Sequence, residues 1–177
     1  MTSIIKVNTF QDTNGNALFS SDGSGNVTLS SADLKGTPAF HVYPSSAPSP
    51  SNVTWTKVSL DTEVFDTDNA FDSTTNYRFT PQVAGKYYIT WFTTDNYSST
   101  AATSVQIGLY KNGSKIHEYQ ANGKGSAYGS YNLSAIVELN GSTDYVEFYV
   151  RNEGGSGVSW RGDSIRTYAQ GYRIIGA

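Results

Sequence analysis

Residues 77–89 have the sequence YRFTPQVAGKYYI, and this stretch decides the fold. A short aromatic strand leads to Pro81, which has no N–H for a strand ladder and so ends or borders the strand. Gly85 allows the positive φ that a tight corner requires, and a second aromatic strand follows it. The stretch therefore predicts two strands joined by a corner, with aromatic side chains on a surface that must be buried.

The composition also favours β structure. The 177 residues include 13 tyrosines and 17 glycines, and these types favour strands and turns over helices. No stretch repeats apolar residues at helical spacing. A chain of this length buries roughly 70% of its unfolded surface without a disulfide, which fits the absence of cysteine. We predict an all-β protein made of one domain and a short appendage.

Charge and hydropathy exclude two kinds of partner. The formal net charge is −3, whereas binding to nucleic-acid phosphates needs clustered Lys and Arg. No apolar run reaches the length of a membrane-spanning helix, and the N-terminus lacks the apolar core and cleavage site of a secretion signal. We expect a soluble chain that binds neither nucleic acid nor membranes.

Residues 1–36 differ from the rest of the chain. Three short apolar segments, 4–10, 17–19 and 27–29, are separated by the turn sequences DTNGN and DGSGN. Three such strands cannot close a core alone, so they need further copies of themselves or another protein; the alternative is a flexible tail. We divide the chain into residues 1–36, a stem, and 37–177, a head. The candidate anchor residues of the stem are Ile4, Ile5, Val7, Phe10, Leu18 and Phe19.

Alternating apolar residues continue through the head. Segments 105–109, 133–139 and 146–150 each place an apolar residue at every second position, which is typical of half-buried strands. Asn112-Gly113 is a strong hairpin turn. Two hairpins with five or six other strands predict a sandwich of two sheets.

The order of Phe79, Pro81, Gly85 and the pair Tyr87-Tyr88 resembles the signature of the complement C1q globular-head family, which belongs with the tumour-necrosis-factor-like jelly rolls. The resemblance covers about residues 38–175. It implies a jelly-roll β-sandwich that assembles as a homotrimer, with aromatic side chains meeting near a threefold axis. The candidates for the trimer interface or the core are Tyr87, Tyr88, Tyr145, Phe148 and Tyr172.

The chain departs from the secreted members of that family, because it has no signal peptide, collagen stalk or cysteine. Residues 1–36 resemble N-terminal segments of fibre and appendage proteins of marine bacteriophages. This resemblance implies a structural protein on the virion surface of a tailed bacteriophage, made in the host cytoplasm. It would be a capsid-decorating knob or short head fibre, held by capsid or tail proteins. The alternatives are a tail-fibre tip, a secreted C1q-like recognition module and an enzyme on a jelly-roll scaffold.

No pattern in the sequence predicts catalysis. His41 and His117 lie on separate predicted strands without a third partner, and there is no nucleophile elbow. The acidic run from Asp61 to Asp72 has oxygen ligands for calcium, but it lacks the spacing of a calcium loop, which favours a solvated loop. Paired carboxylates for glycoside hydrolysis stay open as an alternative. We expect no enzyme activity, no cofactor and no bound metal.

Three loops, 97–103, 122–131 and 154–166, combine aromatic with polar residues. Such loops suit sugar stacking and protein contact alike; the alternative is that they cap the sandwich or line a trimer seam. The integrin-binding tripeptide Arg161-Gly162-Asp163 is short enough to arise by chance. The candidates for recognition of a host-surface glycan or protein are Tyr128, Tyr131, Trp160 and Arg161.

Overall fold

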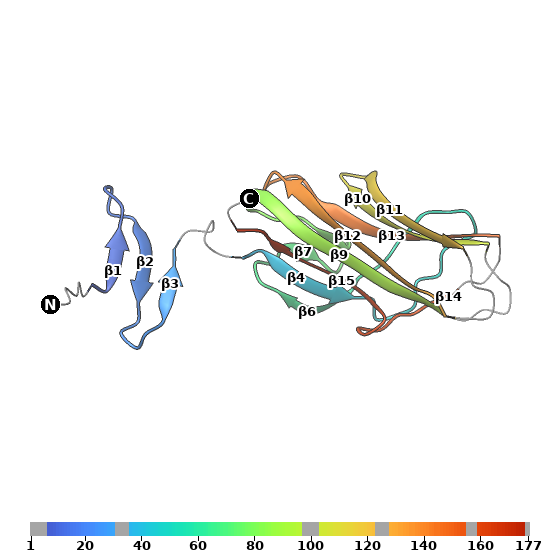
Figure 1. Cartoon of the computed structure of the whole chain (residues 1–177), viewed down its shortest axis with the longest axis horizontal. Helices are drawn as coiled ribbons and strands as arrows, with labels where there is room; N and C mark the ends of the chain where they lie inside the picture. The colour runs from blue at the N-terminus through green and yellow to red at the C-terminus, as the bar shows by residue number, and fades with distance from the viewer. Residues whose placement is uncertain (1–6, 31–35, 97–102, 123–127, 155–158, 176–177) are drawn as a thin grey trace.

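The computed structural model describes residues 7–30, 36–96, 103–122, 128–154 and 159–175, and their regular structure consists of β-strands (Figure 1). None of these residues forms a helix able to cross a membrane. The strands are β1 Thr9–Gln11, β2 Ala17–Ser21, β3 Val27–Leu29, β4 Ala39–Tyr43, β5 Thr56–Lys57, β6 Thr62–Asp66, β7 Phe71–Asp72, β8 Arg78–Phe79, β9 Gly85–Asn96, β10 Ser104–Lys111, β11 Ser114–Asn122, β12 Ser130–Leu139, β13 Val146–Glu153, β14 Ser159–Trp160 and β15 Thr167–Arg173.

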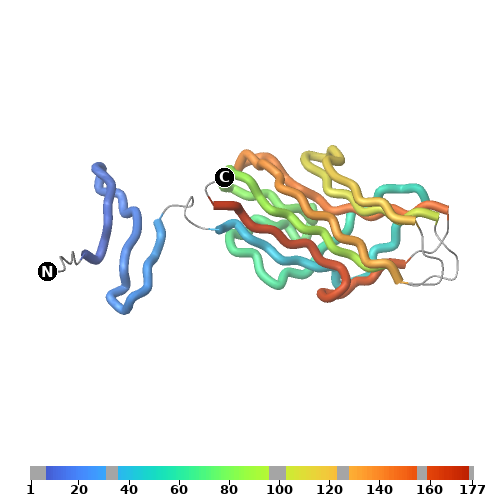
Figure 2. Tube along the Cα trace, viewed as in Figure 1, coloured from blue at the N-terminus to red at the C-terminus, as the bar shows by residue number. Residues whose placement is uncertain are grey.

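Strands β4 to β15 form two sheets that pack face to face, as the trace in Figure 2 shows. The first, called the β9 sheet, has the order β12-β9-β15-β4-β6, and β14 pairs with the end of β9. The second, called the β13 sheet, has the order β11-β10-β13-β8-β7, and β5 pairs with β13. The predicted all-β sandwich is confirmed.

Alternation along the strands decides which side chains form the core. In β9, the long strand between β12 and β15, Tyr87, Ile89 and Trp91 are fully buried between the sheets. Trp91 packs on Phe148 of β13 at 5.6 Å between ring centroids. Phe40 stacks on Phe79 at 4.4 Å. Because each large aromatic buries roughly 150–250 Å², these rings dominate the contact between the two sheets.

The stretch 77–89 forms the expected corner. Its first strand, β8, is short, since Tyr77 just before it has a left-handed φ of 48°. Gly85, the first residue of β9, has a φ of 152°. Glycine adopts this value readily, whereas a residue with a Cβ atom is strained there. The second predicted turn is also present, because Asn112 and Gly113 have φ values of 51° and 76°. These values suit the type I′ turn between β10 and β11.

Strands β1, β2 and β3 form a separate small sheet, which Figure 1 shows beyond one end of the sandwich. Phe10, Phe19 and Leu29 lie opposite one another across its three strands, and the two phenylalanine rings stack at 4.5 Å. Of the six anchor candidates, Val7, Phe10 and Leu18 are exposed and Phe19 is half-buried. The remaining two, Ile4 and Ile5, lie outside the described residues.

Candidate functional site

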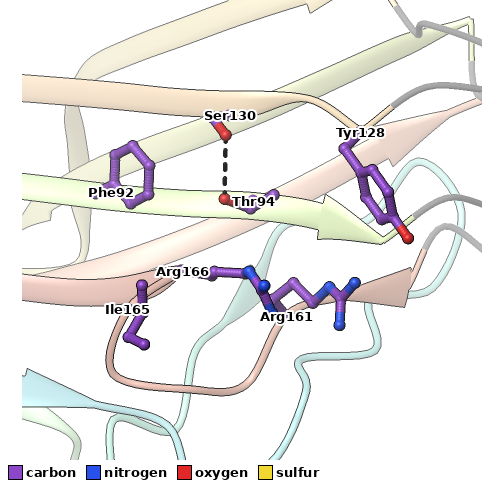
Figure 3. A pocket seen from close by; sticks show the side chains of 7 residues that line it. All are labelled: Phe92, Thr94, Tyr128, Ser130, Arg161, Ile165 and Arg166. Carbon is purple, nitrogen blue, oxygen red and sulfur yellow. Dashed lines mark hydrogen bonds between the residues drawn. The ribbon is translucent and has the colours of Figure 1, made fainter.

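A pocket lies at the end of the β9 sheet, where β9, β12 and the turn before β15 come together (Figure 3). Its volume is about 440 Å³, which falls within the ~300–1,000 Å³ of small-molecule sites. The pocket is lined by Phe92, Thr94, Tyr128, Ser130, Arg161, Ile165 and Arg166. Five charged or hydroxyl-bearing side chains therefore face one opening together with two apolar ones.

Asp95 fixes the wall that β9 and β12 share. This residue lies near the end of β9, and its buried carboxylate accepts hydrogen bonds from the Gly129 N–H at 2.5 Å and the Tyr131 hydroxyl at 2.8 Å. Burial and this hydrogen bond raise the pKa of Tyr131 above its ordinary value. Beside it, the hydroxyls of Thr94 and Ser130 share a hydrogen bond of 3.2 Å, drawn in Figure 3. The anchored strand ends thus present two hydroxyls to the pocket.

The turn between β14 and β15 carries both arginines of the pocket. The Asp163 carboxylate accepts hydrogen bonds from the N–H groups of Ile165 and Arg166, at 3.0 and 2.9 Å. Gly162 lies so close to another loop that a Cβ there would meet the Ser46 carbonyl carbon at 2.2 Å. Because Asp163 closes the turn and Gly162 is packed, the tripeptide 161–163 is built into the wall and is not displayed as a free adhesive loop.

Two arginines line the pocket, and Arg161 is the one that has no carboxylate partner among the described residues. Its guanidinium lies 5.3 Å from the centre of the Tyr128 ring, within the range of a cation–π contact. Its Nε is buried without a hydrogen-bond partner. Arg166, by contrast, lies 3.6 Å from a carboxylate oxygen of Asp163. The pocket therefore has an excess of positive charge.

Two of the four recognition candidates meet in this pocket, and two do not. Tyr128 is 58% exposed and faces Arg161. The prediction that Tyr131 and Trp160 are surface recognition residues is wrong, because they are 2% and 0% exposed. Their rings pack together in the core at 5.9 Å. For Tyr131 the sequence held a signal, since it continues the alternation of Leu133 to Leu139 toward the core.

Sequence reasoning missed the strand residues of the pocket. Phe92 and Thr94 are two residues apart on β9, so alternation places both on the outer face of the sheet. Ser130 comes beside Thr94 only through the pairing of β12 with β9. That pairing joins segments far apart in the chain, and no local pattern in the sequence identifies it.

The same outer face of the β9 sheet carries a group of aromatic and aliphatic side chains, here called the aromatic face: Tyr88, Phe92, Ile136, Tyr168 and Tyr172. Tyr88 lies opposite both Ile136 and Tyr172 in neighbouring strands, and Phe92 stacks on Tyr168 at 5.2 Å. Ile136 and Tyr172 are 61% and 51% exposed.

The five interface or core candidates are divided among three places. Tyr88 and Tyr172 lie on the aromatic face. Tyr87 and Phe148 are fully buried inside the sandwich, so they belong to the core and are not available to a neighbouring copy. Tyr145 lies beside the β13 sheet, where the Arg78 guanidinium is 4.2 Å from its ring centre.

The acidic run 61–72 does not form a cluster. Asp61 accepts hydrogen bonds from Ser45, and Glu63 accepts one from Ser73. Asp72 accepts three backbone N–H bonds from residues 74–76, which lower its pKa. Within the described ranges, no three His, Asp or Glu side chains are grouped so that they could hold a metal ion.

Comparison with solved structures identifies the fold of the chain. No protein-family model matches the sequence, and no curated protein matches it. Among solved structures, murine APRIL is similar with a TM-score of 0.60 at 12% identity, covering 77% of this chain and 98% of the other. The globular domain of a zebrafish complement 1qA protein is similar with a TM-score of 0.58 at 18% identity, covering 77% of this chain and 96% of the other. The head is therefore a C1q/TNF-like jelly roll.

Proposed function

We propose that this protein is a homotrimeric, non-catalytic recognition module, with residues 37–177 as its head and residues 1–36 as its stem. The observation that carries the trimer is the aromatic face. Tyr172 and Ile136 are more than half exposed there although the sandwich has a complete core of its own. A contiguous exposed apolar surface of this kind marks a contact site.

The aromatic face suits contact between identical copies. Its two rows are separated by Thr90 and Gln170, which are polar but uncharged, so copies can meet there without burying a charge. Each large aromatic contributes up to roughly 150–250 Å² of buried surface. Four such rings and Ile136 supply much of the ~800 Å² per partner of a stable interface.

We also propose that the protein is part of a bacteriophage particle. In it, the head projects from the capsid as a knob or short fibre and attaches to a host surface, and the stem binds a capsid or tail protein. What supports it is the stem itself, whose row of Phe10, Phe19 and Leu29 crosses three strands. Phe10 of this row is 45% exposed, and an exposed apolar surface of this kind marks a contact site.

A single charge on the aromatic face tests the trimer. In the variant Tyr172→Arg, three copies would have to bury an unpaired cation, so we expect the trimer to dissociate at micromolar concentration. Sedimentation velocity measures this. The matched control is Tyr119→Arg, since Tyr119 is 43% exposed on β11 in the other sheet; it should stay trimeric. Dissociation of both variants, or of neither, contradicts the assigned face.

Immunogold electron microscopy with antibody against residues 37–177 tests the location. Label over capsids of particles from the source culture is the expected result, and label at tail tips would identify a tail-fibre tip instead. Label on cells without labelled particles would overturn the phage role and leave the recognition module.

A further inference from the structure

We propose that the pocket between β9, β12 and the 161–167 turn binds a saccharide that carries a carboxylate, such as a hexuronic or sialic acid residue. The inference rests on the proposed recognition function and names the chemical class of its ligand. Three features of the pocket lead to it: an arginine without a carboxylate partner, an exposed tyrosine ring, and a pair of hydroxyls.

The positive charge of the pocket favours an anionic ligand. Arg161 has no carboxylate partner among the described residues, and its buried Nε donates no hydrogen bond. The segments 97–102, 123–127 and 155–158 contain no Asp or Glu, so they cannot supply a side-chain carboxylate. A guanidinium forms two parallel hydrogen bonds with a carboxylate. A bound carboxylate would therefore pair with the charge of Arg161 through the terminal amino groups of its guanidinium.

The other walls favour a sugar ring as the carrier of that carboxylate. Tyr128 is 58% exposed and stands beside Arg161, so the exposed part of its ring can stack on the C–H face of a pyranose. The hydroxyls of Thr94 and Ser130 are paired with each other at 3.2 Å and retain lone pairs for sugar hydroxyls. The 440 Å³ volume suits a compact ligand of one or two rings.

The position of the pocket agrees with a recognition role. The chain enters the head beside the start of β9, since the Arg173 N–H donates to the Pro38 carbonyl and the Ile174 N–H to the Lys86 carbonyl. The pocket lies at the other end of β9. A strand of this length spans roughly 35–40 Å, so the ligand would bind at the end of the head farthest from the stem.

A matched pair of sugars tests the proposal on the full-length protein. Methyl β-glucuronide and methyl β-glucoside differ only in the carboxylate, and N-acetylneuraminic acid separates a sialic acid from a hexuronic acid source. Titration followed by ligand-observed NMR should give a millimolar Kd for one acidic sugar or both. The glucoside should bind at least about tenfold more weakly, because it lacks the charge-assisted hydrogen bonds.

Substitutions locate the bound sugar. Arg161→Gln should weaken binding of the acidic sugar by about tenfold or more, and Arg166→Gln, at a more exposed position, serves as a second variant if the first unfolds. The control is Arg78→Gln, which removes the same charge from β8 in the other sheet and should leave the Kd unchanged. The proposal is overturned if no acidic sugar binds at about 10 mM or if Arg78→Gln weakens binding as much as Arg161→Gln. It is also overturned if a glutamate-rich peptide binds through Arg161 while neither acidic sugar binds.

Measuring the native mass of the same samples distinguishes a failure of this proposal from a failure of the proposed trimer. A trimer that binds neither acidic sugar overturns the pocket assignment alone. A monomer that binds the glucuronide through Arg161 overturns the trimer alone.

Discussion

His41 lies on the outer face of β4, between the rings of Phe65 and Tyr168. Its Nε2 is buried and has no hydrogen-bond partner. Burial disfavours the charged imidazolium, and it lowers the pKa of His41 below the ordinary value of 6.5. The residue is next to the aromatic face, so its protonation state bears on the stability of the head.

The first prediction concerns pH. Between the lowered pKa of folded His41 and about 6.5, the unfolded chain binds more protons than the folded one, so the free energy of unfolding decreases as the pH falls through this window. Above about pH 7.5 both states are neutral and the contribution vanishes. In urea titrations from pH 8 to 5, His41→Gln should reduce the slope of this decrease. His117→Gln on the exposed strand β11 is the control, and equal slopes for His41→Gln and the unchanged chain would contradict the prediction.

The burial of single residues could be predicted from the sequence where apolar and polar residues alternate along a strand. The burial of Ile107, Val137 and Val150 follows from this alternation. Trp160 could not be placed in this way, because β14 has only two residues and its register comes from pairing with Asp95 at the end of β9. Its burial depends on a contact between segments 65 residues apart, which no local pattern encodes.

At the scale of elements, the stem sheet and the head are built independently. The core residues of the head all lie between Phe40 and Ala169. Among the described residues, β1, β2 and β3 pair only with one another. Asp12 and Asp22 close the two turns of the stem sheet with the same hydrogen bonds, each accepting from the side-chain amide of the Asn four residues later.

The second prediction follows from that independence. Removing residues 1–36 should leave the melting temperature of the head unchanged within about 2 °C, since the deletion removes no core residue. Differential scanning calorimetry at equal protein concentration measures it. The control is Phe40→Ala in the full chain, which should lower the melting temperature by on the order of 10 °C, because such a cavity costs about 3–5 kcal/mol. A large shift on deletion would mean that the stem packs on the head.

The strands and turns could be predicted from the sequence more readily than the pairing of one strand with another. Two corners, at Gly85 and at Asn112-Gly113, follow from residue types that tolerate a positive φ. The placement of β15 between β9 and β4 does not follow from such patterns. It depends on the resemblance to the jelly-roll fold, because strands from the two ends of the head become neighbours there.

At the scale of the whole molecule, the stem joins the head at one end (Figure 1). The residues that line the pocket lie toward the other end of β9. The aromatic face lies along the β9 sheet and meets the pocket at Phe92. A module that binds copies of itself along its side is able to hold three pockets at one end and three stems at the other. In the proposed trimer, three weak pockets would bind a repetitive surface far more tightly than one pocket would.

The native mass of the full-length chain in solution tests this account most directly. The chain has a mass of 19.2 kDa, and native mass spectrometry at about micromolar concentration should give three times that value, since an interface of roughly 800 Å² per partner is stable at such concentrations. A single species at 19.2 kDa would contradict the central claim. The aromatic face would then be an open surface of a monomer.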